Sequence, residues 1–198
     1  MRTGSLPTAI TLGDVAGIGP EIIVKAFRDS PALMRDCVVI GDVAAMQRAV
    51  DLLTKVDPQA PVVQLLPLKH LSELPATCPA LCMPVLQISQ ALDAAQLPAW
   101  GQISAVAGQL AADSVVWAAN AALRGEVASL VTAPLHKEAL SAAGVPFPGH
   151  TEMLQACAAL HAGVAIDEMP VRMMLANQEL RTVLVSIHVP LREAIESV

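Results

Sequence analysis

The feature that most constrains the fold is a short apolar run at residues 129–131 that stops at Thr132-Ala133-Pro134. The residue before a proline is pushed out of the helical region, so this pattern predicts a buried strand whose end enters a loop. In open α/β sheets, ligands bind outside the carboxyl ends of the strands. We therefore predict one wall of a small-molecule site here, with His150 and Thr151 as substrate contacts. The polar side chains on the loops that follow the strand are His136, Lys137, His150 and Thr151.

The composition favours an α/β fold with a parallel sheet. Of the 198 residues, 54% are hydrophobic and 15% are charged. Ala, Val and Leu supply most of the apolar content, as in parallel strands that helices cover on both faces. A net charge of −6 without any basic run argues against nucleic acid as a partner. Neither a signal peptide nor a membrane span is evident, so we expect a cytoplasmic protein.

A glycine-rich turn at residues 13–19 connects a predicted first strand, residues 7–12, to a helix that begins near Pro20. Proline suits the first helical turn, where its missing N–H is not needed. A glycine turn before a helix N-terminus can hold an anion, but the spacing here is not G-x-G-x-x-G and no G-K-[ST] follows. The turn is therefore either an anion site or a tight connection that needs positive φ angles, and the sequence leaves both open.

A second strand-like run, residues 182–187, ends at His188 before Pro190 and repeats the first pattern. We expect His150 and His188 to lie on strand-end loops at the same edge of one sheet, where two histidines favour a functional role. Lys137 is either a group that neutralises an acidic substrate or a surface lysine. The remaining elements that we expect are strands at 37–40, 62–66 and 84–86 and helices at 43–53, 101–123 and from 191 onward.

The cysteines do not predict a metal centre. Cys78 and Cys82 are four residues apart in a proline-rich segment, with no further Cys or His close by. Free thiols in a reducing compartment are the better interpretation than a zinc pair. Trp117, in the predicted helix 101–123, is expected to serve packing.

Several motifs together resemble one known family. They are G-D-V-A-G-I-G-P-E at residues 13–21, T-A-P-L-H-K at 132–137, G-V-P-F-P-G-H-T-E at 144–152, M-M-L-A at 173–176 and S-I-H-V-P-L-R at 186–192. In this order and spacing they resemble the 4-hydroxythreonine-4-phosphate dehydrogenases of pyridoxal phosphate (vitamin B6) biosynthesis, the PdxA family. Residues 57–98 contribute little to the resemblance.

That resemblance implies two α/β/α lobes like those of isocitrate and isopropylmalate dehydrogenases, a cleft between them, and a homodimer. It implies that NAD or NADP oxidises the secondary alcohol of 4-phosphohydroxy-L-threonine to a keto acid that loses CO2. Family members bind this substrate through the His-Thr of G-H-T-E, here His150 and Thr151. They also bind a divalent metal (Zn, Mg or Co) with three histidines, of which the first corresponds to His188. Such a metal lowers the pKa of the hydroxyl, and the nicotinamide accepts the hydride.

By this resemblance, residues 1–128 form an N-terminal lobe and residues 129–198 begin a second, incomplete lobe. The other two metal histidines of family members, and the Lys, Asn and Arg that grip substrate, lie beyond Val198. We therefore expect a fragment that is inactive by itself. Two alternatives remain open: an oxidative decarboxylase of 4-phospho-erythronate or 4-phospho-threonate, and an inactive module that binds a phosphate ester. A reading frame that continues with two further loop histidines would favour the enzyme.

Overall fold

A parallel sheet forms the centre of the protein in the computed structural model, which describes residues 6–186 and 189–196. Its five strands run in the order β3-β4-β2-β1-β5, and every neighbouring pair is parallel. The predicted α/β class with a parallel sheet is therefore confirmed. The elements of this region are β1 (Thr8–Thr11), α1 (Gly19–Asp29), β2 (Cys37–Gly41), α2 (Val43–Val56), β3 (Gln64–Leu68), η1 (Leu71–Glu73), β4 (Cys82–Gln87), η2 (Ala94–Gln96), α3 (Ala105–Leu123), β5 (Ser129–Thr132), α4 (Lys137–Ala142) and α5 (His150–Ala162).

The two faces of the sheet have separate apolar cores, because alternate side chains of each strand point to opposite faces. On one face, Ile10 and Val39 pack with residues of α1 and α2, among them Phe27 and Met46. On the other face, Val38 and its neighbours pack against α3 and the segment that follows β3. The central strand β2 is buried along its whole length, as expected for a strand covered on both faces.

Short polar side chains determine where the helices begin. Asp42 caps α2 by accepting a hydrogen bond from the Ala45 N–H, at 3.0 Å. Ser104 caps α3 through the Ala107 N–H at 3.1 Å, so this helix begins at Ala105 and not at the predicted residue 101. Such caps satisfy N–H groups that have no partner inside the helix.

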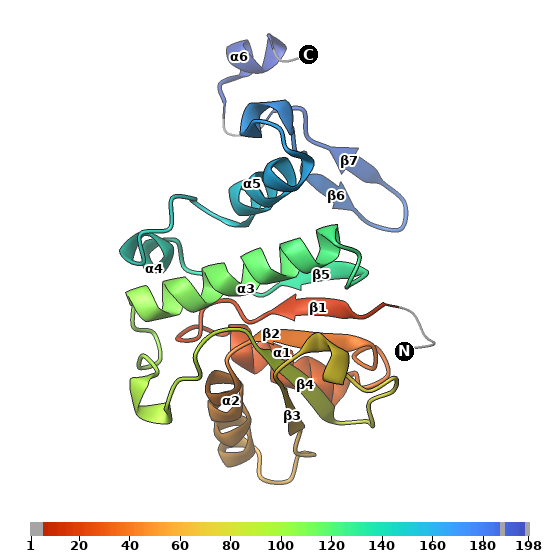
Figure 1. The fold of residues 1–198 in the computed structure, drawn as a ribbon, viewed down its shortest axis with the longest axis vertical. Helices are drawn as coiled ribbons and strands as arrows, with labels where there is room; N and C mark the ends of the chain where they lie inside the picture. The colour runs from red at the N-terminus through yellow and green to blue at the C-terminus, as the bar shows by residue number, and fades with distance from the viewer. Residues whose placement is uncertain (1–5, 187–188, 197–198) are drawn as a thin grey trace.

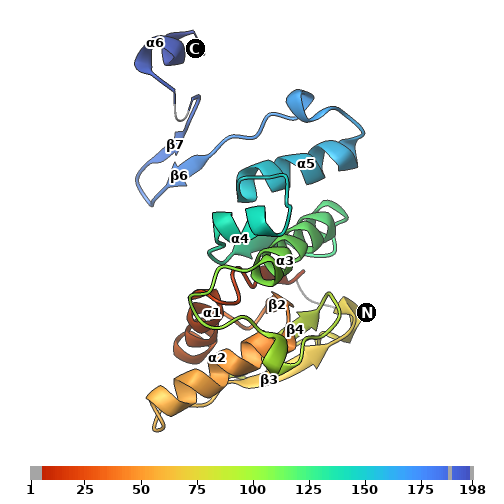
Figure 2. The ribbon, with the colours of Figure 1, turned by 90° about the vertical axis from the view of Figure 1, so that its left-hand side faces the viewer.

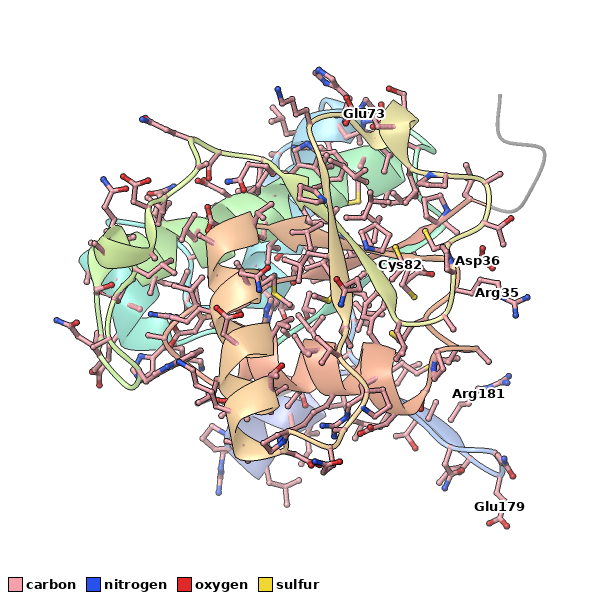
Figure 3. The ribbon with its side chains drawn as sticks, turned by 90° about the horizontal axis from the view of Figure 1, so that it is seen from below. Arg35, Asp36, Glu73, Cys82, Glu179 and Arg181 are labelled. Carbon is pink, nitrogen blue, oxygen red and sulfur yellow. The ribbon has the colours of Figure 1, made fainter. Side chains whose placement is uncertain are left out.

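The C-terminal part of the chain extends away from the sheet. After α5 come η3 (Ile166–Glu168), β6 (Met174–Ala176), β7 (Arg181–Val183) and α6 (Leu191–Ile195). Figures 1 and 2 both place β6, β7 and α6 at the end of the molecule opposite α2. Seen from below the sheet, the labelled residues Glu179 and Arg181 project from the β6–β7 hairpin, away from the other side chains (Figure 3).

The predicted strand at residues 182–187 is wrong in extent and in partner. Among the described residues β7 ends at Val183, and it pairs antiparallel with β6 in a sheet of their own. The cause is a local turn: the Asn177 side chain accepts hydrogen bonds from the N–H groups of Glu179 and Leu180, at 2.8 and 2.6 Å. An asparagine that bonds the backbone two residues on favours such a turn, which folds the chain back into a hairpin.

The sheet continues across residues 128 and 129, where we predict the boundary between the two lobes. Strand β5 pairs with β1 over its full length, from Thr8–Ser129 to Thr11–Thr132. A boundary at this position would divide a continuous sheet, and the division into two lobes with a cleft stays a prediction.

Candidate functional site

The ends of β1 and β5 lie side by side, since Thr11 pairs with Thr132. Beyond Thr11 the glycine turn approaches the β5 end closely, and the Asp14 N–H donates to the Pro134 carbonyl at 2.9 Å. Gly13 has φ of 71°, and a Cβ atom on it would collide with the same carbonyl oxygen. The glycine is therefore required both by its backbone conformation and by the close approach of the two loops.

His150 lies at the first position of α5, half-buried beside this pair of strand ends. Burial lowers the pKa of its imidazole, and a backbone hydrogen bond with Ala133 acts in the opposite direction with less effect. The structure thus brings His150 to the end of β5, as predicted. A lowered pKa leaves the ring uncharged at neutral pH, because burial disfavours the charged form.

Nε2 of His150 and Oγ1 of Thr11 are buried beside the ends of β1 and β5 and have no hydrogen-bond partner within the described residues; the same holds for Nε of Arg48 and Oγ of Ser89. Buried polar atoms in folded proteins are nearly always paired, so each unpaired one needs an explanation. An atom that a bound ligand would satisfy is one such explanation, and it suits His150 because the ring stands at the carboxyl edge of the sheet.

Thr151 follows in the first turn of α5, also half-buried, and no side chain caps this helix N-terminus. The helix is held in place by Met153, which is buried against α3 and Leu140. His136 and Lys137 are exposed at the start of α4. A shallow hollow of about 450 Å³ lies between α4 and the loop before α5, lined by Lys137, Ser141, Val145, Pro146, Phe147 and Pro148.

His188 lies outside the described residues. The strands that precede the two histidines belong to different sheets, and the expectation that both follow strands of one sheet is therefore wrong. Within residues 6–186 and 189–196, no three His, Cys, Asp or Glu side chains come together to hold a metal ion. Cys78, which is buried, and Cys82 form no disulfide with each other.

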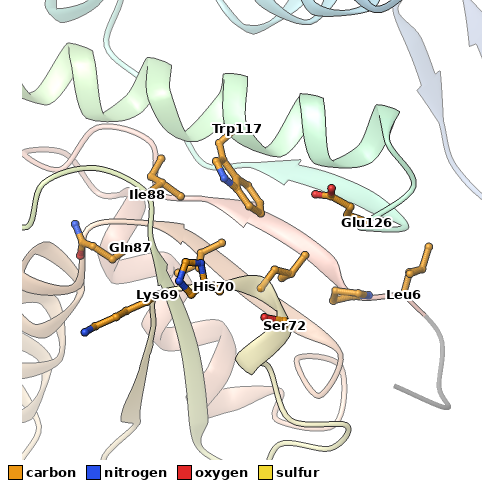
Figure 4. A pocket seen from close by; sticks show the side chains of 11 residues that line it. Leu6, Lys69, His70, Ser72, Gln87, Ile88, Trp117 and Glu126 are labelled. Carbon is orange, nitrogen blue, oxygen red and sulfur yellow. The ribbon is translucent and has the colours of Figure 1, made fainter. Parts of the chain in front are cut away.

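A second hollow, of about 610 Å³, lies on the α3 face of the sheet. Trp117 reaches into it from α3, and His70 and Lys69 line it from the segment after β3 (Figure 4). Trp117 also packs against the core of this face, which agrees with the packing role predicted for it. His150 and Thr151 do not line this hollow.

Sequence reasoning missed two groups of contacts at the carboxyl edge. Asp42 is fully buried and accepts hydrogen bonds from Gln87 Nε2 at 2.9 Å and from the Leu92 N–H at 3.2 Å. Arg48 donates to the carbonyl oxygens of Val15 and Pro98. The Gly41-Asp42 pair directly after a strand could have indicated the Asp42 contacts, whereas no local sequence pattern indicates the Arg48 contacts.

No helix among the described residues is both long and apolar enough to cross a membrane.

Comparison with known proteins supports the resemblance. Residues 33–198 match the sequence profile of the family described as "Pyridoxal phosphate biosynthetic protein PdxA". The chain is 43% identical over 189 residues to a 4-hydroxythreonine-4-phosphate dehydrogenase of Beijerinckia indica, covering 96% of this chain and 50% of the relative. It is 36% identical to a D-threonate 4-phosphate dehydrogenase of Salmonella typhimurium, covering 96% of this chain and 53% of that one.

A solved structure agrees in fold. The crystal structure of a 4-hydroxythreonine-4-phosphate dehydrogenase from Klebsiella pneumoniae superposes with a TM-score of 0.79 at 32% identity, covering 99% of this chain and 54% of that chain. The chain thus spans about half the length of the relatives that it matches.

Proposed function

The chain belongs to the PdxA family, and from this premise we propose that it is the N-terminal half of an NAD(P)-dependent dehydrogenase. The substrate that we propose is 4-phosphohydroxy-L-threonine, oxidised in vitamin B6 biosynthesis. The relative with the higher identity is named for this activity, whereas the D-threonate 4-phosphate enzyme is 36% identical. Oxidation of a phosphorylated threonate or erythronate is the second candidate.

The observation that carries the proposal is the unpartnered Nε2 of His150, buried at the carboxyl edge of the sheet. Because burial lowers the pKa of this ring, the imidazole is neutral at pH 7 and forms a hydrogen bond in preference to an ion pair. A neutral imidazole suits a hydroxyl group better than a phosphate. We therefore assign His150 to a substrate hydroxyl.

Thr151 and the N-terminus of α5 suit the anionic part of such a substrate. The backbone N–H groups of a helix N-terminus and the helix dipole both favour negative charge. No side chain caps α5, and the Thr151 hydroxyl is a further donor in the same turn. Within the family, His-Thr is the substrate-binding pair, which is why we propose the same role for both residues here.

The reaction oxidises the secondary alcohol. Oxidation breaks the C–H bond of the carbinol carbon and the O–H bond of the hydroxyl and forms a C=O bond; a base takes the proton, and NAD(P) bound to the complete enzyme would accept the hydride. A carboxylate β to that carbonyl is then lost as CO2. In this scheme His150 holds and orients the hydroxyl, and bound nicotinamide supplies the hydride acceptor.

We propose that His188 belongs to a divalent-metal site whose other ligands come from sequence beyond Val198. We propose further that the complete enzyme is a cytoplasmic homodimer with a cleft between two lobes. By this account residues 1–198 alone are inactive.

The test uses the chain itself and the intact enzyme. Addition of 4-phosphohydroxy-L-threonine to residues 1–198 is expected to shift the NMR signals of the His150 imidazole, without NAD(P) reduction. In the intact enzyme His150→Gln is expected to lower kcat/KM by about 100-fold, as for loss of a positioned hydrogen bond in the transition state. His161→Gln, an exposed histidine at the other end of α5, is the matched control.

Full activity of His150→Gln would remove His150 from the site. Turnover by residues 1–198 alone would show that this chain holds a complete site. Comparing 4-phosphohydroxy-L-threonine with D-threonate 4-phosphate and 4-phospho-erythronate decides which substrate the enzyme prefers.

A further inference from the structure

Arg48 bridges two loops at the carboxyl edge of the sheet. It lies on α2, and its Nη1 donates to the Pro98 carbonyl at 2.6 Å while its Nη2 donates to the Val15 carbonyl at 2.8 Å. The side chain of Trp100 covers the guanidinium, with the Cζ atom 4.1 Å from the ring centroid. One side chain thus joins the glycine turn to the loop before α3.

The two loops also touch directly. The Gly101 N–H donates to the Ala16 carbonyl at 2.7 Å, next to the Arg48–Val15 bond. Arg48 and this backbone bond therefore hold the glycine turn from one side. From the other side the turn is held by the end of β5, through the bond from the Asp14 N–H to the Pro134 carbonyl.

The Arg48 guanidinium loses part of its hydration at this position between the two loops. Burial lowers the pKa of Arg48, no carboxylate of the described residues forms an ion pair with it, and its buried Nε has no hydrogen-bond partner among them. Burying part of a charge without a counter-ion costs solvation free energy, which hydrogen bonds to the guanidinium can offset. The planar guanidinium has several donors in a fixed geometry, so two of them can reach separate carbonyl groups while the Trp100 ring covers one face.

The turn that Arg48 holds lies against the site. Gly13 and Gly19 both approach Ala133, the residue whose backbone bonds His150. We propose that Arg48 is a positioning residue: through Val15 it fixes the glycine turn against the end of β5 and so fixes the support on which His150 rests. The importance of Arg48 for turnover rests on the function proposed above. The hydrogen bonds that Arg48 forms with the two loops do not depend on that function.

Two variants of residues 1–198 test the bridge. Arg48→Met removes the charge and both donors but keeps the length of the side chain, and Arg48→Lys keeps the charge but cannot form the fork. Lys55→Met is the matched control, because it removes one exposed positive charge from the same helix. Backbone amide exchange is measured at Asp14 and Gly101, with Val38 of the central strand as the internal reference.

Both Arg48 variants are expected to raise the exchange rates of Asp14 and Gly101 by about tenfold or more, the effect of losing a hydrogen bond to a charged group. Val38 should keep its rate, and Lys55→Met should match the wild type. If Arg48→Met does not fold, Arg48→Lys provides the same test. Wild-type exchange in Arg48→Lys, or an equal rise at Val38, would overturn the proposal.

The link to His150 has its own measurement, an NMR titration of the imidazole. If the turn supports His150, Arg48→Met exposes the ring and its pKa moves up, toward that of an exposed histidine. General destabilisation would not shift this titration under conditions where the variant stays folded. An unchanged His150 titration beside increased exchange would overturn the positioning role. Inactivity of the intact enzyme toward phosphorylated hydroxy acids would refute the proposed function without affecting either result.

Discussion

Apolar side chains are buried in the region around the five-stranded sheet but exposed in the C-terminal arm, which comprises residues 163–186 and 189–196. In the sheet region Leu12, Val39 and Phe27 are at most 2% exposed. In the arm Leu175 is 59% exposed, Leu180 65% and Leu191 80%. Contiguous exposed apolar surface on a protein usually marks an interaction site. The difference teaches that the sheet region has its own core, whereas the described part of the arm has no cover for its apolar side chains.

The largest effect that distinguishes the two regions is the loss of a core side chain. Phe27 of α1 is 2% exposed within the core beneath β1 and β2. Phe27→Ala removes a buried ring and leaves a cavity, so it should lower the free energy of unfolding by about 3–5 kcal/mol. Urea denaturation measures this change. Equal destabilisation by Leu175→Ala in the arm would contradict the comparison.

A smaller effect is expected where α3 contacts α4. Gly108 lies inside α3, and a Cβ atom there would collide with the backbone of Ala139. Replacing a helical glycine by alanine normally stabilises, by about 1 kcal/mol. Here the collision should reverse the sign, and Gly108→Ala should destabilise by about 1–3 kcal/mol because the two helices must move apart. A stabilised variant in the same denaturation experiment would show that α4 is loosely held.

His150 gives the sheet region a pH dependence of stability. Its pKa is lowered by burial, so between that pKa and 6.5 the unfolded chain binds more protons than the folded one. The free energy of unfolding should therefore fall as the pH drops below 6.5, and His150→Gln should remove this part of the dependence. Denaturation from pH 7 to pH 5 measures it.

Sequence patterns within single segments predicted the strands and helices that such segments form. Apolar runs that end at a glycine or proline turn located β1, β2 and β5, and periodic apolar spacing located α2 and α3 within a few residues. The prediction that His150 lies near the carboxyl end of the strand at residues 129–132 agrees with its position beside Ala133. By contrast, the bridge from Arg48 spans 33 residues to Val15 and 50 to Pro98, and no single segment carries its signal. Such contacts depend on tertiary packing that sequence periodicity does not report.

The arm is where the sequence pattern misled, and it carries the smallest expected effect on stability. The apolar run that begins at Thr182 has the composition of a buried strand, yet Val183 is 48% exposed and Val185 57%. Leu175→Ser should thus change the free energy of unfolding by less than about 0.5 kcal/mol, as for other exposed positions.

The same substitution should change self-association instead. Exposed apolar strands with unpaired edges promote association, and a hydroxyl at position 175 reduces the apolar area of β6. Sedimentation velocity over a range of concentrations is therefore expected to show less association for Leu175→Ser than for the wild type. As a control, Glu179→Gln alters the turn of the same hairpin without reducing its apolar area. The free energy of unfolding is thus expected to depend on the sheet region and self-association on the arm. If Leu175→Ser lowered the free energy of unfolding as well as self-association, the arm and the sheet would form one cooperative unit.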